Sequence, residues 1–147
     1  MSTVPLEVVT PERVVLNAEV QMVTLRGGGG DLGILPRHAP LATTVRPGVV
    51  KVRVAEGEDY LAVGGGFLHV MPDRITLLVD TAEIGSQVDV ERAANARERA
   101  EKRLSERGAE VDVARVEAAL MRARHRLQAA ELSTRSGEAL RQHMAKR

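Results

Sequence analysis

The spacing of the apolar residues changes at Asp89, and this change limits the fold more than any other feature of the sequence. Before Asp89, Val, Ile, Leu and Thr recur in short runs of strand length that end at turn residues such as Pro47-Gly48. After it, Ala, Glu, Arg and Leu dominate, and apolar residues recur every three or four positions, which is the period of a helix. We therefore predict a β domain over residues 1–88 and an α domain over residues 89–147.

The β domain is predicted to be an antiparallel β-sandwich. No segment within it is long enough for the crossover helix that parallel strands usually need, so an antiparallel sandwich or barrel is the simplest fold. The four glycines at 27–30 are predicted to form a flexible loop. With one Phe, one Tyr and no Trp in the chain, the core must consist of Val, Leu, Ile and Ala. The runs of strand length are residues 6–9, 14–16, 20–25, 41–45, 49–54, 60–63, 67–70 and 75–79.

The α domain is predicted to be an antiparallel two-helix hairpin. Asp89 and Asp112 suit helix N-caps, and Gly108 suits the end of the first helix. The first helix has an Ala-rich apolar seam, which buries little area, so the hairpin is expected to associate weakly and to be able to open. After Leu132 the polar run weakens the helix, and the last ten residues are predicted to be a frayed extension. The two seams are Ala93, Ala96, Ala100 and Leu104, and Val113, Val116, Leu120, Ala123, Leu127 and Ala130.

The chain lacks the side chains that most catalytic and metal sites need. It has no Cys, and its four His residues show no metal-ligand spacing. Its glycine runs lack the Gly-Lys-Ser/Thr of a phosphate loop, and no paired acid and base are visible. We therefore expect a non-catalytic protein without a metal site. The scarcity of aromatic rings argues against binding of single-stranded nucleic acid. The lack of a signal peptide or an apolar run of transmembrane length favours a cytoplasmic protein without membrane insertion.

Two surface features could bind partners. Residues 33–41 place three large aliphatic side chains and two prolines in one connection, which either lies under the sandwich or contacts a partner. Each helix also carries three arginines within about 40° around its axis, at about 100° per residue. Clustered guanidinium groups suit phosphate, although the glutamates between them leave a solvated charged face as the alternative. The arginines are Arg92, Arg99 and Arg103 in the first helix and Arg115, Arg122 and Arg126 in the second.

Three blocks of sequence, in this order and spacing, resemble the epsilon subunits of bacterial F-type ATP synthases. They are residues 30–41 (Gly-Asp-Leu-Gly-Ile-Leu-Pro-Arg-His-Ala-Pro-Leu), 46–50 (Arg-Pro-Gly-Val-Val) and 65–70 (Gly-Gly-Phe-Leu-His-Val). The resemblance covers about residues 4–132. It implies a ten-stranded sandwich followed by a helical hairpin. It also implies a non-catalytic rotor subunit in the central stalk, peripheral to the cytoplasmic face of the cell membrane, that joins the gamma subunit to the c-ring.

The resemblance implies three sets of functional residues. Rotor contacts would come from Asp31, Leu32, Ile34, Leu35, Arg37 and His38, although Arg37 stands where the family usually has Gly. No cofactor is required, but residues 88–93 (Val-Asp-Val-Glu-Arg-Ala) are similar to an Ile/Leu-Asp-x-x-Arg-Ala motif that binds regulatory ATP. That site would comprise Glu83, Val88, Asp89, Arg92, Ala93, Arg99, Arg122 and Arg126. When the hairpin extends, a basic face would meet the alpha and beta subunits and inhibit ATP hydrolysis: Arg115, Arg122, Arg124, Arg126 and Arg135.

A different class of function stays open from the residues alone. A free-standing, ligand-binding β-sandwich with a coiled-coil dimerisation tail would show the same change of period. That protein would be a dimer through its helices, whereas an epsilon subunit on its own would be a monomer, and size-exclusion chromatography separates the two.

Overall fold

Ten short strands form the N-terminal part of the protein. The computed structural model describes residues 2–106, 108 and 111–143. All eight predicted strands are present. The pattern missed β4, in which two of five residues are Gly, and β10, which has only three residues. The strands are β1 (Val4–Val9), β2 (Val14–Val20), β3 (Met22–Gly27), β4 (Gly30–Ile34), β5 (Leu41–Val45), β6 (Gly48–Val54), β7 (Gly57–Val63), β8 (Gly66–Met71), β9 (Arg74–Val79) and β10 (Ala82–Ile84).

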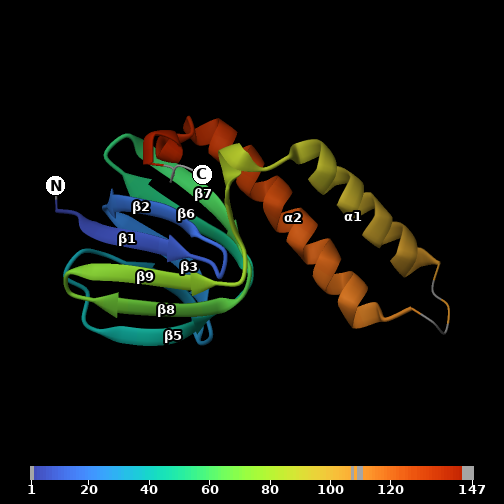
Figure 1. The fold of residues 1–147 in the computed structure, drawn as a ribbon, viewed down its shortest axis with the longest axis horizontal. Helices are drawn as coiled ribbons and strands as arrows, with labels where there is room; N and C mark the ends of the chain where they lie inside the picture. The colour runs from blue at the N-terminus through green and yellow to red at the C-terminus, as the bar shows by residue number, and fades with distance from the viewer. Residues whose placement is uncertain (1, 107, 109–110, 144–147) are drawn as a thin grey trace.

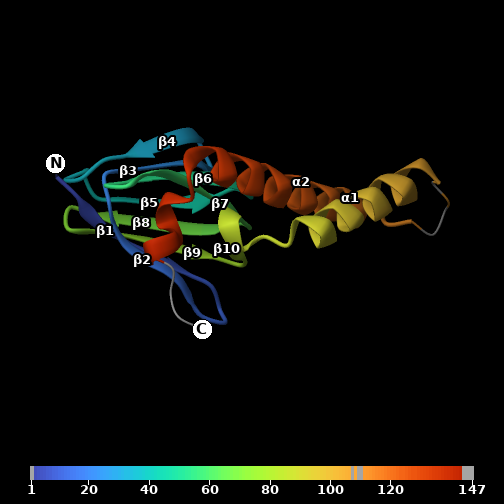
Figure 2. The same cartoon turned by 90° about the horizontal axis from the view of Figure 1, so that it is seen from above.

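The strands pair in one continuous sheet that folds over itself into a sandwich (Figure 1, Figure 2). Their order is β10-β7-β6-β3-β5-β8-β9-β1-β2, and β4 pairs with β3. The sheet turns where β3 and β5 share a single residue pair, Gly27 with Val45. The predicted antiparallel sandwich is confirmed with one exception, because β1 runs parallel to β9. The glycines at 27–30 form the tight β3–β4 connection, with Gly27 and Gly30 paired, rather than the predicted flexible loop.

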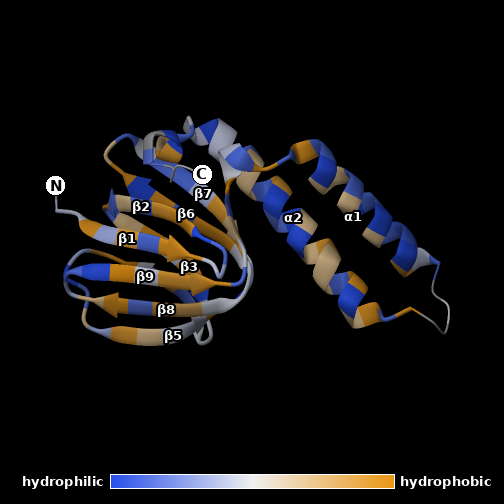
Figure 3. Ribbon diagram, viewed as in Figure 1, coloured by the Kyte–Doolittle hydropathy of each residue, from blue (hydrophilic) through white to orange (hydrophobic). Residues whose placement is uncertain are grey.

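The sandwich core is aliphatic, as the composition predicted. Along β8, for example, Leu68 and Val70 are buried while Phe67 and His69 face outward. The two aromatic rings stay out of the core: Phe67 is 48% exposed and Tyr60 is half-buried. The alternation of apolar and polar residues along the strands is visible in Figure 3. The core therefore consists of thin layers of Val, Leu, Ile and Ala.

Two antiparallel helices follow the sandwich. A 3-10 turn, η1 (Gly85–Gln87), leads into α1 (Val90–Ser105), and α2 (Val113–Ser136) returns beside it. Asp89 and Asp112 are the N-caps, as predicted, and each carboxylate accepts a backbone N–H from the first turn of its helix. α1 ends three residues before Gly108. The helices share a small apolar cluster of Ala100, Val116 and Leu120, with Leu104 and Val111 against it.

The C-terminal end of the described chain also departs from the predicted hairpin. α2 continues to Ser136, and Gly137 ends it with a left-handed φ of 86°. A second 3-10 turn, η2 (Ala139–His143), then packs on the sandwich, and Ala139 and Leu140 join the sandwich core. The predicted frayed extension is therefore wrong for residues 138–143, because apolar side chains after the cap pack in the core, and the predicted weakening after Leu132 is wrong because the helix continues to Ser136. Residues 144–147 lie outside the described residues.

Candidate nucleotide site beneath the helical hairpin

A hollow of about 320 Å³ lies where the end of the sandwich, the first turns of α1 and the middle of α2 meet. Seven of the eight residues predicted to bind nucleotide line it: Glu83, Val88, Asp89, Arg92, Ala93, Arg99 and Arg126. The eighth, Arg122, lies one turn before Arg126 on α2 and lines an adjoining smaller hollow with Glu83 and Arg126. The structure thus brings together residues from β10, α1 and α2 that are up to 43 positions apart in the sequence, from Glu83 to Arg126.

The start of α1 sets the shape of this hollow. Asp89 Oδ1 accepts the backbone N–H of Arg92 at 3.0 Å, which fixes the first turn of the helix. Because residues three and four apart share one helix face, Ala93, Ala96 and Arg99 point to the same side as Val88 and the hollow. The two alanines have short side chains, so open space remains between the arginines.

The hollow has an excess of positive charge. Arg126 Nε lies 2.6 Å from Glu83 Oε1, and each side chain is about one-third exposed. Within the described residues, Arg92, Arg99 and Arg122 form no ion pair. The lining of the larger hollow carries three guanidiniums against the two carboxylates of Glu83 and Asp89, which leaves one positive charge in excess. Grouped guanidiniums without partners suit a ligand with several negative charges, such as a polyphosphate.

Gln87 adds a feature that the sequence did not predict. The residue lines the same hollow, and its Oε1 atom is buried without a hydrogen-bond partner among the described residues. A buried acceptor left unpaired costs about 1–3 kcal/mol. Gln87 lies in the turn before the motif, where no sequence pattern singles it out.

The residues predicted to contact the rotor form a separate surface, on β4 and the turn after it. Ile34 is fully buried in the core, so its side chain takes no part in a surface contact, and Leu32 packs partly against the core. Leu35 is 54% exposed, and Asp31 and Arg37 are exposed. His38 is half-buried, with its Nδ1 2.6 Å from the Ala39 carbonyl oxygen, to which it donates.

The predicted basic face of α2 is two stripes rather than one. At about 100° per residue, Arg115, Arg122 and Arg126 share one side of the helix, and Arg124 and Arg135 lie on the opposite side. Arg122 and Arg126 line the hollows against the sandwich. Arg124 is exposed, and Arg135 is exposed and pairs with Glu131 at 3.0 Å. The prediction of a single face is wrong because it counted the arginines without their angular positions.

Other chemistry has no geometric support in the described residues. No group of three or more His, Asp or Glu side chains there is arranged to hold a metal ion. In the same part of the chain, no helix has the length and apolar character that crossing a bilayer requires.

Two family models together match almost all of the described chain. Residues 3–85 match the ATP synthase delta/epsilon chain β-sandwich domain, and residues 86–131 match the ATP synthase delta/epsilon chain long α-helix domain. The chain belongs to the ATP synthase delta/epsilon family. The boundary between the two matches falls in η1, where the strands end.

Bacterial members of the family match the chain closely. The ATP synthase epsilon chain of Moorella thermoacetica is 54% identical over 108 residues, which cover 73% of this chain and 81% of the relative. That of Desulforamulus reducens is 48% identical over 126 residues, 86% of this chain and 96% of the relative. Within the family, therefore, the chain is an epsilon subunit of ATP synthase.

The same fold occurs in solved ATP synthase structures. A chain of the Euglena gracilis mitochondrial ATP synthase (OSCP/F1/c-ring) superposes with a TM-score of 0.72 at 24% identity, covering 90% of this chain and 82% of that one. A chain of the Tetrahymena thermophila central stalk and c-ring gives a TM-score of 0.50 at 16% identity, covering 89% and 96%. At these identities the comparison shows a shared fold.

Proposed function

We propose that the chain is a non-catalytic subunit of the central stalk, in which the sandwich joins the gamma subunit to the c-ring and the hairpin restrains ATP hydrolysis. This proposal rests on membership of the ATP synthase delta/epsilon family. It is supported by the similar chain from Tetrahymena, which belongs to a structure of the central stalk and c-ring. A subunit in that position is peripheral to the cytoplasmic face of the cell membrane.

The turn after β4 is the proposed rotor contact. Asp31, Leu35, Arg37 and His38 reach its surface, while Ile34 supports it from the core. An exposed Leu35 between charged neighbours suits a polar partner surface with an apolar centre.

The orientation of α2 supports a regulatory role for the hairpin. With α2 docked, Arg122 and Arg126 line a hollow against the sandwich, and Arg126 pairs with Glu83. If α2 left the sandwich, these arginines and Arg115 would form one basic stripe, which suits docking on acidic surfaces of the alpha and beta subunits.

Reassembly of an ATP synthase that lacks its own epsilon subunit tests both roles. The full chain should co-purify with tagged gamma subunit, and the complex with residues 89–147 deleted should hydrolyse ATP faster than the complex with the full chain. Replacement of Arg115, Arg122 and Arg126 by Ala should reproduce part of this increase, whereas Arg124→Ala/Arg135→Ala should reproduce less. Failure to co-purify would contradict the stalk role, and unchanged hydrolysis after deletion would contradict the inhibitory role.

We further propose that ATP binds the hollow beneath the hairpin and favours the docked state. Arg92 and Arg99 on α1 and Arg122 and Arg126 on α2 converge only when the hairpin is closed. Because a ligand shifts an equilibrium only by its differential affinity, a triphosphate held by both helices favours the closed form.

Calorimetry on the isolated protein tests this site. Arg122→Ala/Arg126→Ala should lose at least tenfold in ATP affinity, about 1.4 kcal/mol, since both guanidiniums face the hollows. Arg124→Ala is the matched control, because it removes the same group from the opposite side of α2, and its affinity should stay within about twofold of the wild type. No heat from the wild type at millimolar ATP would contradict the proposal.

A further inference from the structure

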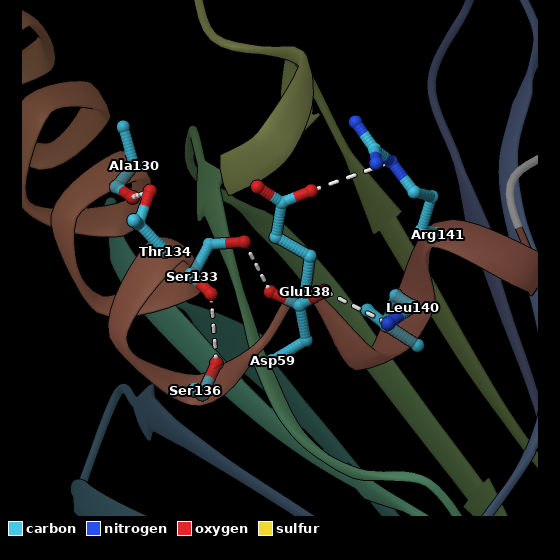
Figure 4. Close-up of polar contacts among 8 residues, drawn as sticks. All are labelled: Asp59, Ala130, Ser133, Thr134, Ser136, Glu138, Leu140 and Arg141. Atoms are coloured by element: carbon cyan, nitrogen blue, oxygen red, sulfur yellow. Dashed lines mark hydrogen bonds and ion pairs between the residues drawn. The ribbon is translucent and has the colours of Figure 1, made fainter.

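A buried carboxylate on the sandwich holds the C-terminal end of the chain. Asp59 on β7 is 0% exposed. Its Oδ1 accepts the hydroxyl of Ser133 at 2.6 Å and its Oδ2 accepts the backbone N–H of Leu140 at 2.8 Å (Figure 4). Its Oδ1 also accepts the backbone N–H of Tyr60 at 2.8 Å. Two of these three donors come from residues 74 and 81 positions further along the chain.

The same segment places apolar groups in the sandwich. Leu140 is 0% exposed and Ala139 is 7% exposed, and both belong to the sandwich core. The chain reaches this position through two consecutive left-handed residues, Gly137 at φ 86° and Glu138 at φ 56°. Glu138 is not a glycine, so the surrounding contacts must offset its backbone cost, about 1–2 kcal/mol.

Two further contacts join this end of α2 to the sandwich. Gly85 lies directly under α2, where a Cβ would clash with the Ala129 carbonyl and the Ser133 side chain, so the helix touches the backbone of η1. His143 Nε2 lies 3.2 Å from Glu56 Oε2, which connects the end of η2 to the turn between β6 and β7.

Most of these contacts use residues beyond the match to the family helix domain. That match ends at residue 131, before Ser133, Leu140 and His143, whereas Ala129 lies within it.

We propose that the surface around Asp59 is an intramolecular docking site whose occupant is the segment 133–143, and that this latch holds α2 on the sandwich without any ligand. Release of α2 removes two of the three hydrogen-bond donors of the Asp59 carboxylate, and it withdraws Leu140 from the core. Both losses occur together, because Ser133 and Leu140 lie on either side of the same Gly137 turn. The latch shares no residue with the nucleotide site, so each can be altered by substitutions that leave the other site's residues in place.

Hydrogen–deuterium exchange of the full chain without nucleotide tests the latch. Ser133→Ala and Leu140→Ala should each speed exchange of the α2 amides at 129–136 at least tenfold, because local opening of α2 becomes easier. Ser136→Ala is the matched control, since its hydroxyl donates only to the Ser133 carbonyl within the same turn, and it should change the rates less than about twofold. The amides of β8 and β9 provide an internal reference and should keep their wild-type rates in all variants.

Two results would overturn the proposal. Wild-type exchange of the α2 amides in both Ser133→Ala and Leu140→Ala would show that the segment does not hold the helix. Equal acceleration of α2, β8 and β9 would show that the segment stabilises the whole fold rather than the docking of the hairpin. Ser133→Ala removes a single hydroxyl, so it keeps the test valid if Leu140→Ala fails to fold.

Discussion

Arg37 has a backbone conformation that residues with a Cβ rarely adopt. Its φ is 63°, and among the described non-glycine residues only Glu138 shares this positive sign. The left-handed region costs a non-glycine residue about 1–2 kcal/mol. Arg37 occupies it because the turn after β4 must reverse within a few residues, with the His38 N–H donating to the Leu35 carbonyl at 3.2 Å. Arg37 thus holds a backbone geometry that favours glycine.

Arg37→Gly should therefore stabilise the protein. We expect the free energy of unfolding to rise by about 0.5–1 kcal/mol, since the relief of backbone strain exceeds the added entropy of the unfolded chain. Urea denaturation measures the change. Arg74→Gly is a matched control at the exposed start of β9, where φ is not positive, and it should destabilise. A less stable Arg37→Gly variant would mean that the arginine side chain contributes more than its backbone costs.

At the scale of elements, His125 lies at the interface between α2 and the sandwich. It lines a hollow of about 360 Å³ beneath α2, and burial, together with the nearby Arg26 charge, lowers its pKa below the ordinary value of 6.5. Charged and titratable groups face it from several elements: Arg26 on β3, Asp31 on β4, Lys51 on β6, Tyr60 on β7, Glu83 on β10, and Arg122 and Arg126 on α2. Most of these groups are cationic, so a protonated His125 is unfavourable there.

Acid should therefore weaken the docking of α2. A histidine whose pKa is lowered in the docked state leaves docking at full strength above about pH 6.5, and docking weakens as the pH falls towards the lowered pKa. Urea denaturation at pH 7.5 and pH 5.5 should show a loss of stability in the wild type that is smaller in His125→Gln. The wild type and His125→Gln share the other three histidines, so the difference in their stabilities at each pH reports on His125. An equal loss in both proteins would contradict a role for His125.

At the scale of the whole molecule, local patterns predicted the elements but not how distant segments meet. The change of period at Asp89, both N-caps and the helix seams are short-range signals, and the structure confirms them. The parallel pairing of β1 with β9 has no local signal because the two strands are far apart in sequence. The docking of Leu140 likewise depends on Asp59, 81 residues earlier.

The candidate site was likewise predictable only in part from local sequence patterns. Its arginines were visible as stripes, but spacing alone left a solvated face as the alternative, and only the resemblance to the family selected the other residues. Gln87 has no signal at all, because an unpaired acceptor exists only once the hollow around it has formed. The prediction of a single basic face on α2 was wrong because arginines that are close in the sequence lie on opposite sides of the helix.

The exclusion of aromatic rings from the core gives the protein its own spectroscopic reporter. There is no Trp to dominate the ultraviolet emission, and Tyr60 is the single tyrosine of the chain. Tyr60 is half-buried and lines the hollow beneath α2 with Gln128 and Leu132, and its backbone N–H donates to Asp59. The surroundings of Tyr60 therefore change when α2 departs. Changes in the position of the hairpin can be followed by tyrosine fluorescence in the unlabelled protein.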